Sequence, residues 1–290
     1  AGVNPLKLAR TVRGLGRVML EQGRYQDAEP LARRARSITE QALGPDHPEV
    51  ATDLDRLGAV YFRQGRLEDA EPLRARALAI REQALGPDHP DVATSLLNLG
   101  ALYNRQGRLD EAEAYWLRSL AIRERVLGPD HPHVASSLTN IGSLYRNQGR
   151  LEEAEPLLRR ALTIKQQTLD PNHPEVAGSL VYLAGLHQDQ GRLDEAESLM
   201  RAAVPIRERV FGAEHQETVR AVAGLARILR QQRRYAEAEP LFERALGDLD
   251  PSSPPNDPDT VATARDYILL LRALDRDAEA EALEAWLNQT

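Results

Sequence analysis

Gln22-Gly23-Arg24 returns every 42 residues along the chain, and this repetition points to the fold. Further copies of Gln-Gly-Arg stand at 64–66, 106–108, 148–150 and 190–192, and an altered copy stands at 232–234. A second string, Gly-Pro-Asp-His-Pro, begins at residues 44, 86 and 128 with the same spacing. Self-similarity at a fixed period of this length is the sequence signature of a repeat architecture.

An alanine in every copy indicates that the period continues to the end of the chain. It stands at positions 28, 70, 112, 154, 196, 238 and 280. We therefore predict about seven helix-turn-helix repeats in one all-α domain that spans residues 1–290. Their approximate bounds are 5–46, 47–88, 89–130, 131–172, 173–214, 215–256 and 257–290. The proline-rich stretch 250–258 is predicted to be a stiff spacer before the last repeat.

Each repeat is predicted to be a pair of helices, as the second repeat shows. Leu57 and Tyr61 belong to a series of apolar residues at helical spacing in a first helix over about 47–64. Gly65 then supplies a left-handed residue that ends this helix, and a second helix follows over about 67–85. A pair of this size cannot bury its apolar faces alone, so neighbouring pairs must stack into a solenoid.

The start of each first helix is also encoded. Asp46 is followed by an acidic residue, Glu49, three positions later, and Asp88 is followed in the same way by Asp91. This spacing resembles a capping box, so we expect Asp46 and Asp88 to cap their helices.

Leu99-Gly100-x-x-Tyr103, with Ala112 and Trp116 further on, resembles the signature of the tetratricopeptide repeat (TPR). The 42-residue length and the Gly-Pro-Asp-His-Pro loop are similar to the longer repeat of kinesin light chains. The resemblance implies a right-handed TPR superhelix whose concave groove is lined mainly by first helices. It also implies a protein–protein interaction scaffold, since the kinesin light chain type reads peptides that carry a tryptophan flanked by acids.

The resemblance places a set of basic, amide and aromatic residues at or near this groove. These peptide-binding candidates are Arg10, Arg13, Arg17, Arg56, Arg63, Asn98, Asn104, Arg105, Asn140, Arg146 and Tyr182. Arginine suits carboxylates and asparagine can hold a peptide backbone, so an acidic peptide or protein segment is the expected partner. The competing interpretation is that these arginines only solvate a helix face.

Three of these candidates occupy one repeat position and form a ladder: Arg56, Asn98 and Asn140. The fourth member of the series is Tyr182, which is expected either to close the site or to stack on a ligand.

Composition excludes several classes of function. The net charge of −7 argues against a nucleic-acid partner and against docking on an anionic membrane by charge. The chain has no cysteine, and no apolar run is long enough to span a membrane. We expect a cytoplasmic protein, and the excess of arginine over lysine suggests a bacterial source.

The sequence contains no motif that indicates an enzyme or a cofactor site independently of the repeat. His47, His89, His131 and His173 recur one repeat apart, too far from one another to share a metal ion. No nucleotide-binding or nucleophile motif occurs, so we expect neither catalysis nor a cofactor. Two alternatives to a peptide scaffold stay open: an assembly module, including a homo-oligomer through the solenoid ends, and the sensor arm of a larger multidomain protein whose catalytic part lies elsewhere.

Overall fold

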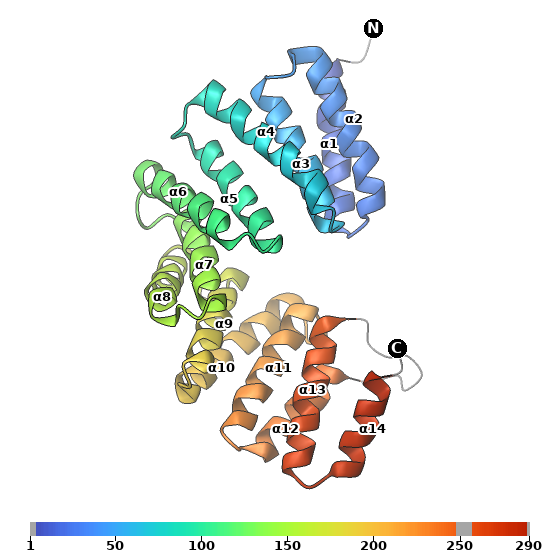
Figure 1. Cartoon of the computed structure of the whole chain (residues 1–290), viewed down its shortest axis with the longest axis vertical. Helices are drawn as coiled ribbons and strands as arrows, with labels where there is room; N and C mark the ends of the chain where they lie inside the picture. The colour runs from blue at the N-terminus through green and yellow to red at the C-terminus, as the bar shows by residue number, and fades with distance from the viewer. Residues whose placement is uncertain (1–3, 248–256, 289–290) are drawn as a thin grey trace. The chain divides into compact units, whose positions relative to one another are not determined.

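The computed structural model describes residues 4–247 and 257–288, and these residues form helices joined by short turns (Figure 1). The first helices of the repeats are α1 (Pro5–Glu21), α3 (Pro48–Arg63), α5 (Pro90–Arg105), α7 (Pro132–Asn147), α9 (Pro174–Asp189), α11 (Gln216–Gln231) and α13 (Pro258–Ala273). The second helices are α2 (Tyr25–Leu43), α4 (Leu67–Leu85), α6 (Leu109–Leu127), α8 (Leu151–Thr168), α10 (Leu193–Phe211), α12 (Tyr235–Leu246) and α14 (Asp277–Leu287). The prediction of an all-α helix-turn-helix repeat is confirmed. The expected spacer is described only at Asp257 and Pro258, because residues 248–256 lie outside the described part.

The chain divides into two compact units, residues 1–144 and 145–290, and each is described by itself. Within each unit, the two helices of a repeat pack against each other, as α1 and α2 do, and the second helix of a repeat packs against the first helix of the next, as α2 does with α3 and α10 with α11. The repeated alanine sits where the two helices of a repeat meet, and all seven copies have an exposed fraction of 0%. A larger side chain would keep the backbones apart, which explains why this position stays small.

The turns inside the repeats follow the prediction. Gly65 and its equivalents have positive φ, for example +78° at Gly65 and +77° at Gly107, and they end the first helices. Arg233 stands at the same position in the altered sixth copy and adopts φ +62°, which is unfavourable for a residue with a Cβ.

The caps of the first helices differ from the prediction. The cap residue of α3 is His47 rather than Asp46, and its Nδ1 accepts a hydrogen bond from the backbone N–H of Glu49 at 3.2 Å. His89 caps α5 in the same way, through Asp91 at 3.1 Å. The following proline explains the shift, because it keeps the residue before it extended and is itself favoured at the first helical position. The recurring histidines are therefore helix caps.

A cluster of three side chains, repeated along the chain, joins consecutive repeats. In its first copy, Gln64 and Arg66 of the second repeat donate to Glu29 of the first repeat at 3.1 and 3.0 Å. Further copies of the arginine–glutamate contact are Arg108–Glu71, Arg192–Glu155, Arg234–Glu197 and Arg276–Glu239. We call this the Glu–Gln–Arg cluster. It explains why the Gln-Gly-Arg string recurs: the glycine turns the chain, and its two neighbours bind the preceding repeat.

The cluster makes the stability of the fold depend on pH. At Glu155, burial raises the pKa, but hydrogen bonds from Gln190, Arg159 and Arg192 outweigh it and lower the pKa from 4.5 to about 2. A lowered pKa means that the unfolded chain binds the proton more readily than the folded one. The stabilisation is therefore fully present above about pH 4.5 and is lost as the pH falls through about 2.

We expect Glu155→Gln to lower the melting temperature at pH 7 and to flatten its decline between pH 5 and pH 2, because the amide cannot ionise. Thermal unfolding followed by circular dichroism over this range measures both effects. Glu152→Gln is the control, since Glu152 is exposed and has no ion pair within the described residues. Parallel pH curves for the wild type and Glu155→Gln would contradict the assignment.

Candidate functional site

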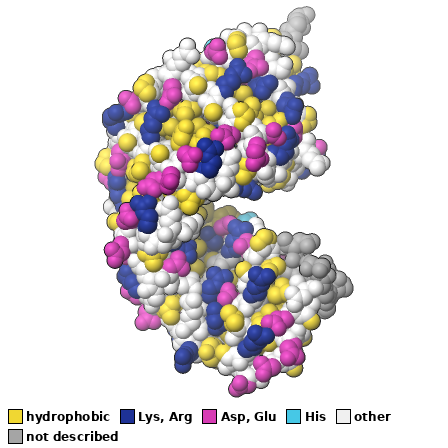
Figure 2. Space-filling view, viewed as in Figure 1, with side chains coloured by type: hydrophobic (Ala, Val, Ile, Leu, Met, Phe, Trp, Pro, Cys, Tyr) yellow, Lys and Arg dark blue, Asp and Glu magenta, His cyan; other side chains and the backbone are white. Residues whose placement is uncertain are grey.

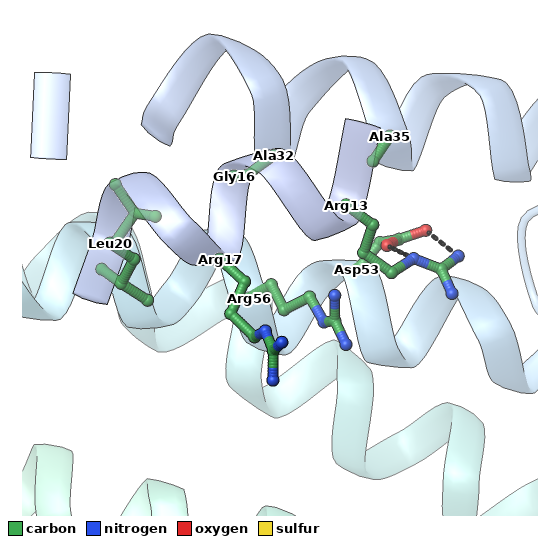
Figure 3. A pocket seen from close by; sticks show the side chains of 9 residues that line it. Arg13, Gly16, Arg17, Leu20, Ala32, Ala35, Asp53 and Arg56 are labelled. Atoms are coloured by element: carbon green, nitrogen blue, oxygen red, sulfur yellow. Dashed lines mark hydrogen bonds and ion pairs between the residues drawn. The ribbon is translucent and has the colours of Figure 1, made fainter. Parts of the chain in front are cut away.

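Three of the predicted binding residues meet around one pocket in the unit of residues 1–144. Arg13 and Arg17 come from α1 and Arg56 comes from α3, and all three line a pocket of about 520 Å³ that is partly open to solvent (Figure 3). Its other walls are small or apolar residues, namely Gly16, Leu20, Ala32, Ala35 and Val60, together with the carboxylate of Asp53. The pocket thus combines an apolar wall with an arginine-rich one.

The pocket exists because one repeat position is small in the first repeat and large in the others. Ala32 of α2 occupies this position, and its equivalents in the second to sixth repeats are Arg74, Trp116, Leu158, Met200 and Phe242. All five of these larger side chains are buried.

The third repeat shows what the larger side chain does at this position. Trp116 packs against Gly100 of its own repeat, where an added Cβ would lie 2.4 Å from the indole Nε1. The indole N–H donates to the carbonyl oxygen of Leu97 at 3.0 Å. In the second repeat, the guanidinium of Arg74 reaches the carbonyl oxygen of Asn98 on the following first helix. A side chain at this position therefore fills a socket between consecutive repeats, and Ala32 leaves that socket empty.

Arg13 is held in place by carboxylates of the second repeat. Its Nε lies 2.8 Å from Oδ1 of Asp53, whose side chain is fully buried, and its Nη2 lies 3.2 Å from the exposed Glu49. Thr39 accepts a further hydrogen bond at 3.3 Å. Because its Nη2 donates to three side chains and its charge faces two carboxylates, Arg13 forms part of the structural wall of the pocket.

Arg56 is the charged group of this pocket that lacks a carboxylate of its own. It is half-buried, and no ion pair or hydrogen bond joins it to any residue in 4–247 or 257–288. Burial and the positive charges of Arg13 and Arg17 lower the pKa of Arg56, while Asp53 acts in the opposite direction. Arg17 is exposed, and its one ion pair among the described residues is a 3.7 Å contact with Glu21 of its own helix. An added anion would relieve this excess of positive charge.

The other candidates do not join this pocket. Arg105 donates to the carbonyl oxygen of Phe62 at 2.9 Å and stacks on its ring, and Arg146 contacts Asp189 at 2.5 Å, so both link neighbouring repeats. Arg10 and Arg63 are exposed, and Asn104 is half-buried on α5.

The four residues of the ladder are divided between the two units. Asn98 and Asn140 are half-buried on α5 and α7, at the positions equivalent to Arg56. Tyr182 is 43% exposed on α9 and belongs to the other unit. Its proposed role in closing the site stays a prediction.

The sequence-based candidates omitted the residues that shape the pocket. The signal was present: aligning the repeats shows Ala32 in a column of large side chains.

The surface drawn in Figure 2 carries mixed charge, with Lys and Arg side chains interspersed among Asp and Glu. Among the described residues, no three His, Cys, Asp or Glu side chains gather to hold a metal, and no helix has the length and apolar character needed to cross a bilayer.

Solved structures resemble this chain in both sequence and fold. BtubC (BKLC) from P. vanneervenii is 25% identical, with a TM-score of 0.62 over 72% of this chain and 83% of that one. A putative kinesin light chain from P. anserina with nearly identical TPR-like repeats is 26% identical, with a TM-score of 0.59 over 72% of this chain and 99% of that one. The apo form of the quorum sensor NprR from B. thuringiensis shares the fold at 16% identity, with a TM-score of 0.71 over 98% of this chain and 76% of that one.

No curated protein sequence matches the chain significantly. A family model, the tetratricopeptide repeat, matches residues 7–73, 51–114, 92–167, 139–177 and 175–248. Together these matches span most of the chain and lie over its helix pairs. The chain therefore belongs to the tetratricopeptide repeat family, and its repeats are of the kinesin light chain type.

Proposed function

We propose that this protein is a scaffold for protein–protein interaction, and that its first repeat binds an acidic peptide segment carrying one bulky apolar side chain. The observation that carries the proposal is the state of Arg56, which is half-buried beside two other arginines and has no carboxylate partner among the described residues. A ligand carboxylate at this place would supply the missing partner through a charge-assisted hydrogen bond.

The apolar wall of the same pocket supports the second half of the proposal. The socket beside Ala32 is filled by Trp116 in the third repeat and by Leu158 in the fourth, so a side chain of either size fits the geometry of this repeat. Burying such a side chain contributes about 1.5–3 kcal/mol. An acidic peptide with a tryptophan or leucine would therefore combine an apolar anchor with ionic contacts at Arg17 and Arg56, and no catalytic step is required of the scaffold.

We expect Ala32→Leu and Arg56→Gln each to weaken binding of such a peptide by about tenfold or more, because they remove the socket and the charged hydrogen bond respectively. The probe is a fluorescein-labelled nonapeptide with a central tryptophan flanked on each side by two aspartates or glutamates. Fluorescence anisotropy gives its dissociation constant. The same peptide with asparagine and glutamine in place of the acids is the control ligand and should bind weakly to every variant.

Arg63→Glu is the matched protein control, because Arg63 is an exposed arginine of the same helix outside the pocket. Arg13 is left unchanged, since its contact with Asp53 makes it part of the fold. Equal loss of binding in Arg63→Glu and Arg56→Gln would show general electrostatic attraction, and unchanged binding in Ala32→Leu would exclude the socket.

A further inference from the structure

One position near the end of the first helices is tyrosine in three consecutive repeats and becomes histidine in the fifth. Tyr61, Tyr103 and Tyr145 occupy it in the second, third and fourth repeats, and His187 of α9 occupies it in the fifth. We propose that His187 is a pH-sensitive contact between the fourth and fifth repeats, which holds them together while it is neutral and loosens them when it takes up a proton. This site lies in the unit of residues 145–290 and is independent of the peptide pocket in the first repeat.

The second repeat shows what the tyrosine does at this position. The hydroxyl oxygen of Tyr61 accepts a hydrogen bond from Nη2 of Arg33 in the preceding repeat at 2.6 Å. The guanidinium of Arg66, at the turn of the same repeat, lies 4.1 Å from the centre of the ring. The second of these contacts recurs in the third and fourth repeats. A phenol has no basic nitrogen, so these contacts do not change when the pH falls below neutral.

His187 replaces the phenol by a ring that can gain a proton. The residue is 1% exposed, and its Nε2 lies 3.4 Å from Nη2 of Arg159, which stands at the repeat position of Arg33. A guanidinium can only donate, so this contact is a hydrogen bond only when Nε2 carries no proton. The ring proton then lies on Nδ1, which is buried and has no hydrogen-bond partner among the described residues. The neutral ring with its proton on Nδ1 is therefore the form that fits this place.

Protonation removes the one acceptor that the ring offers. Both nitrogens of an imidazolium donate, so Nε2–H would face the N–H groups of Arg159, and the proton on Nδ1 would still lack an acceptor. The added charge would also be buried, and burying a charge costs free energy unless a counter-charge and hydrogen bonds compensate it. The folded contact between the two repeats therefore disfavours the charged form of His187.

The charged groups around the ring act in the same direction. Glu155 and Arg159 lie on α8, Glu195 lies in the first turn of α10, and Arg192 is the residue before that helix. Burial lowers the pKa of His187 below its ordinary value of 6.5, and the positive charges of Arg192 and Arg159 lower it further. The two glutamates raise it and offset only part of this effect.

Both glutamates are already bound by these arginines. Glu155 accepts hydrogen bonds at 2.8 and 3.0 Å from the two, and Glu195 accepts one at 3.1 Å. On the side of α11, Gln188 binds the neutral side chain of Gln231 at 3.0 Å. These neighbours of His187 therefore include no uncommitted carboxylate that could pair with an imidazolium.

The direction of the pKa shift fixes the pH range of the effect. When this part of the chain opens, the imidazole regains its ordinary pKa of about 6.5 and binds a proton more readily than in the folded state. The stabilisation that neutral His187 provides is therefore fully present above about pH 6.5 and is lost as the pH falls through its lowered pKa. The pKa of Glu155 is about 2, so this residue stays ionised throughout the range in which His187 responds.

Hydrogen exchange of the whole chain at pH 7.5 and pH 5.5, followed by mass spectrometry and corrected for the intrinsic pH dependence of exchange, tests the proposal. In the wild type we expect the opening of α8, α9 and α10 to increase by up to about tenfold at pH 5.5, because this pH lies one unit below the ordinary pKa of histidine. His187→Tyr and His187→Gln cannot take up a proton at this position, and each should remove the increase. Peptides from α3 to α6 are the internal reference and should not respond to either substitution.

His173→Asn is the matched control, because it removes another histidine of the same helix. His173 caps α9 through its Nδ1, which accepts from the backbone N–H of Glu175 at 3.2 Å, and asparagine is also a good cap. This variant should keep the increase of the wild type. The imidazole signal that disappears from the NMR spectrum of His187→Gln gives the pKa of His187 directly, and we expect it below 6.5.

Four results would overturn the proposal: a pKa of 6.5 or higher for His187, a wild type whose opening does not change between the two pH values, an increase that persists in both His187 variants, or an increase that His173→Asn abolishes.

Discussion

Gly100→Ala is expected to lower the free energy of unfolding by about 1–3 kcal/mol, the range for overpacking a core. This is the reverse of the usual effect, since alanine is favoured over glycine inside a helix by about 1 kcal/mol. The added Cβ would lie 2.4 Å from Nε1 and 2.5 Å from Cδ1 of Trp116. The indole cannot move aside freely, because it is 4% exposed and donates to the carbonyl oxygen of Leu97.

Urea unfolding followed by circular dichroism measures the change. Gly178→Ala in α9 is the matched control, because a Cβ there would meet nothing within 4 Å, and it should stabilise by about 0.5–1 kcal/mol. Combining Gly100→Ala with Trp116→Leu should relieve the clash, since Leu158 occupies the same position in the fourth repeat. A stabilising Gly100→Ala, equal to the control, would show that the glycine has no packing role.

The helices of the repeats could be predicted closely because every signal for them is local. The second repeat was expected to place its helices over about 47–64 and 67–85, and the structure has α3 at Pro48–Arg63 and α4 at Leu67–Leu85. Glycine at the turn and apolar residues at helical spacing act within a few residues of where they stand. The cap prediction was wrong at Asp46 because two local signals competed, and the proline at the first helical position decided in favour of His47.

The candidate site could be predicted only in part, because its properties depend on residues one repeat away. The resemblance to TPR proteins placed Arg13, Arg17 and Arg56 on one face, and the structure gathers them at one pocket. Asp53 determines which of the arginines already has a carboxylate partner. It lies 40 positions from Arg13, and helix periodicity does not identify a contact over this distance. The pocket itself arises from the side chain that Ala32 lacks, which only a comparison between repeats reveals.

Asp53→Asn is expected to lower the free energy of unfolding by on the order of 3 kcal/mol, because it leaves a largely buried arginine without its main counter-charge. The side chain of Asp53 is fully buried and that of Arg13 is 13% exposed. Removing the carboxylate also takes away the one negative charge that acts on Arg56 from within the pocket. Glu49→Gln is the matched control, since Glu49 contacts the same arginine but is 47% exposed, and it should change stability by less than about 1 kcal/mol.

The same variant tests whether the pocket accepts an anion. Inorganic phosphate at constant ionic strength should raise the melting temperature of Asp53→Asn more than that of the wild type, because a ligand bound only by the folded state stabilises it. Adding Arg56→Gln to Asp53→Asn should remove this extra response, since it removes the arginine that has no other partner in the pocket. An equal response to phosphate in all three proteins would mean that the arginines around the pocket bind no anion and are solvated by water alone. The acidic ligand would then have to bind elsewhere on the repeats.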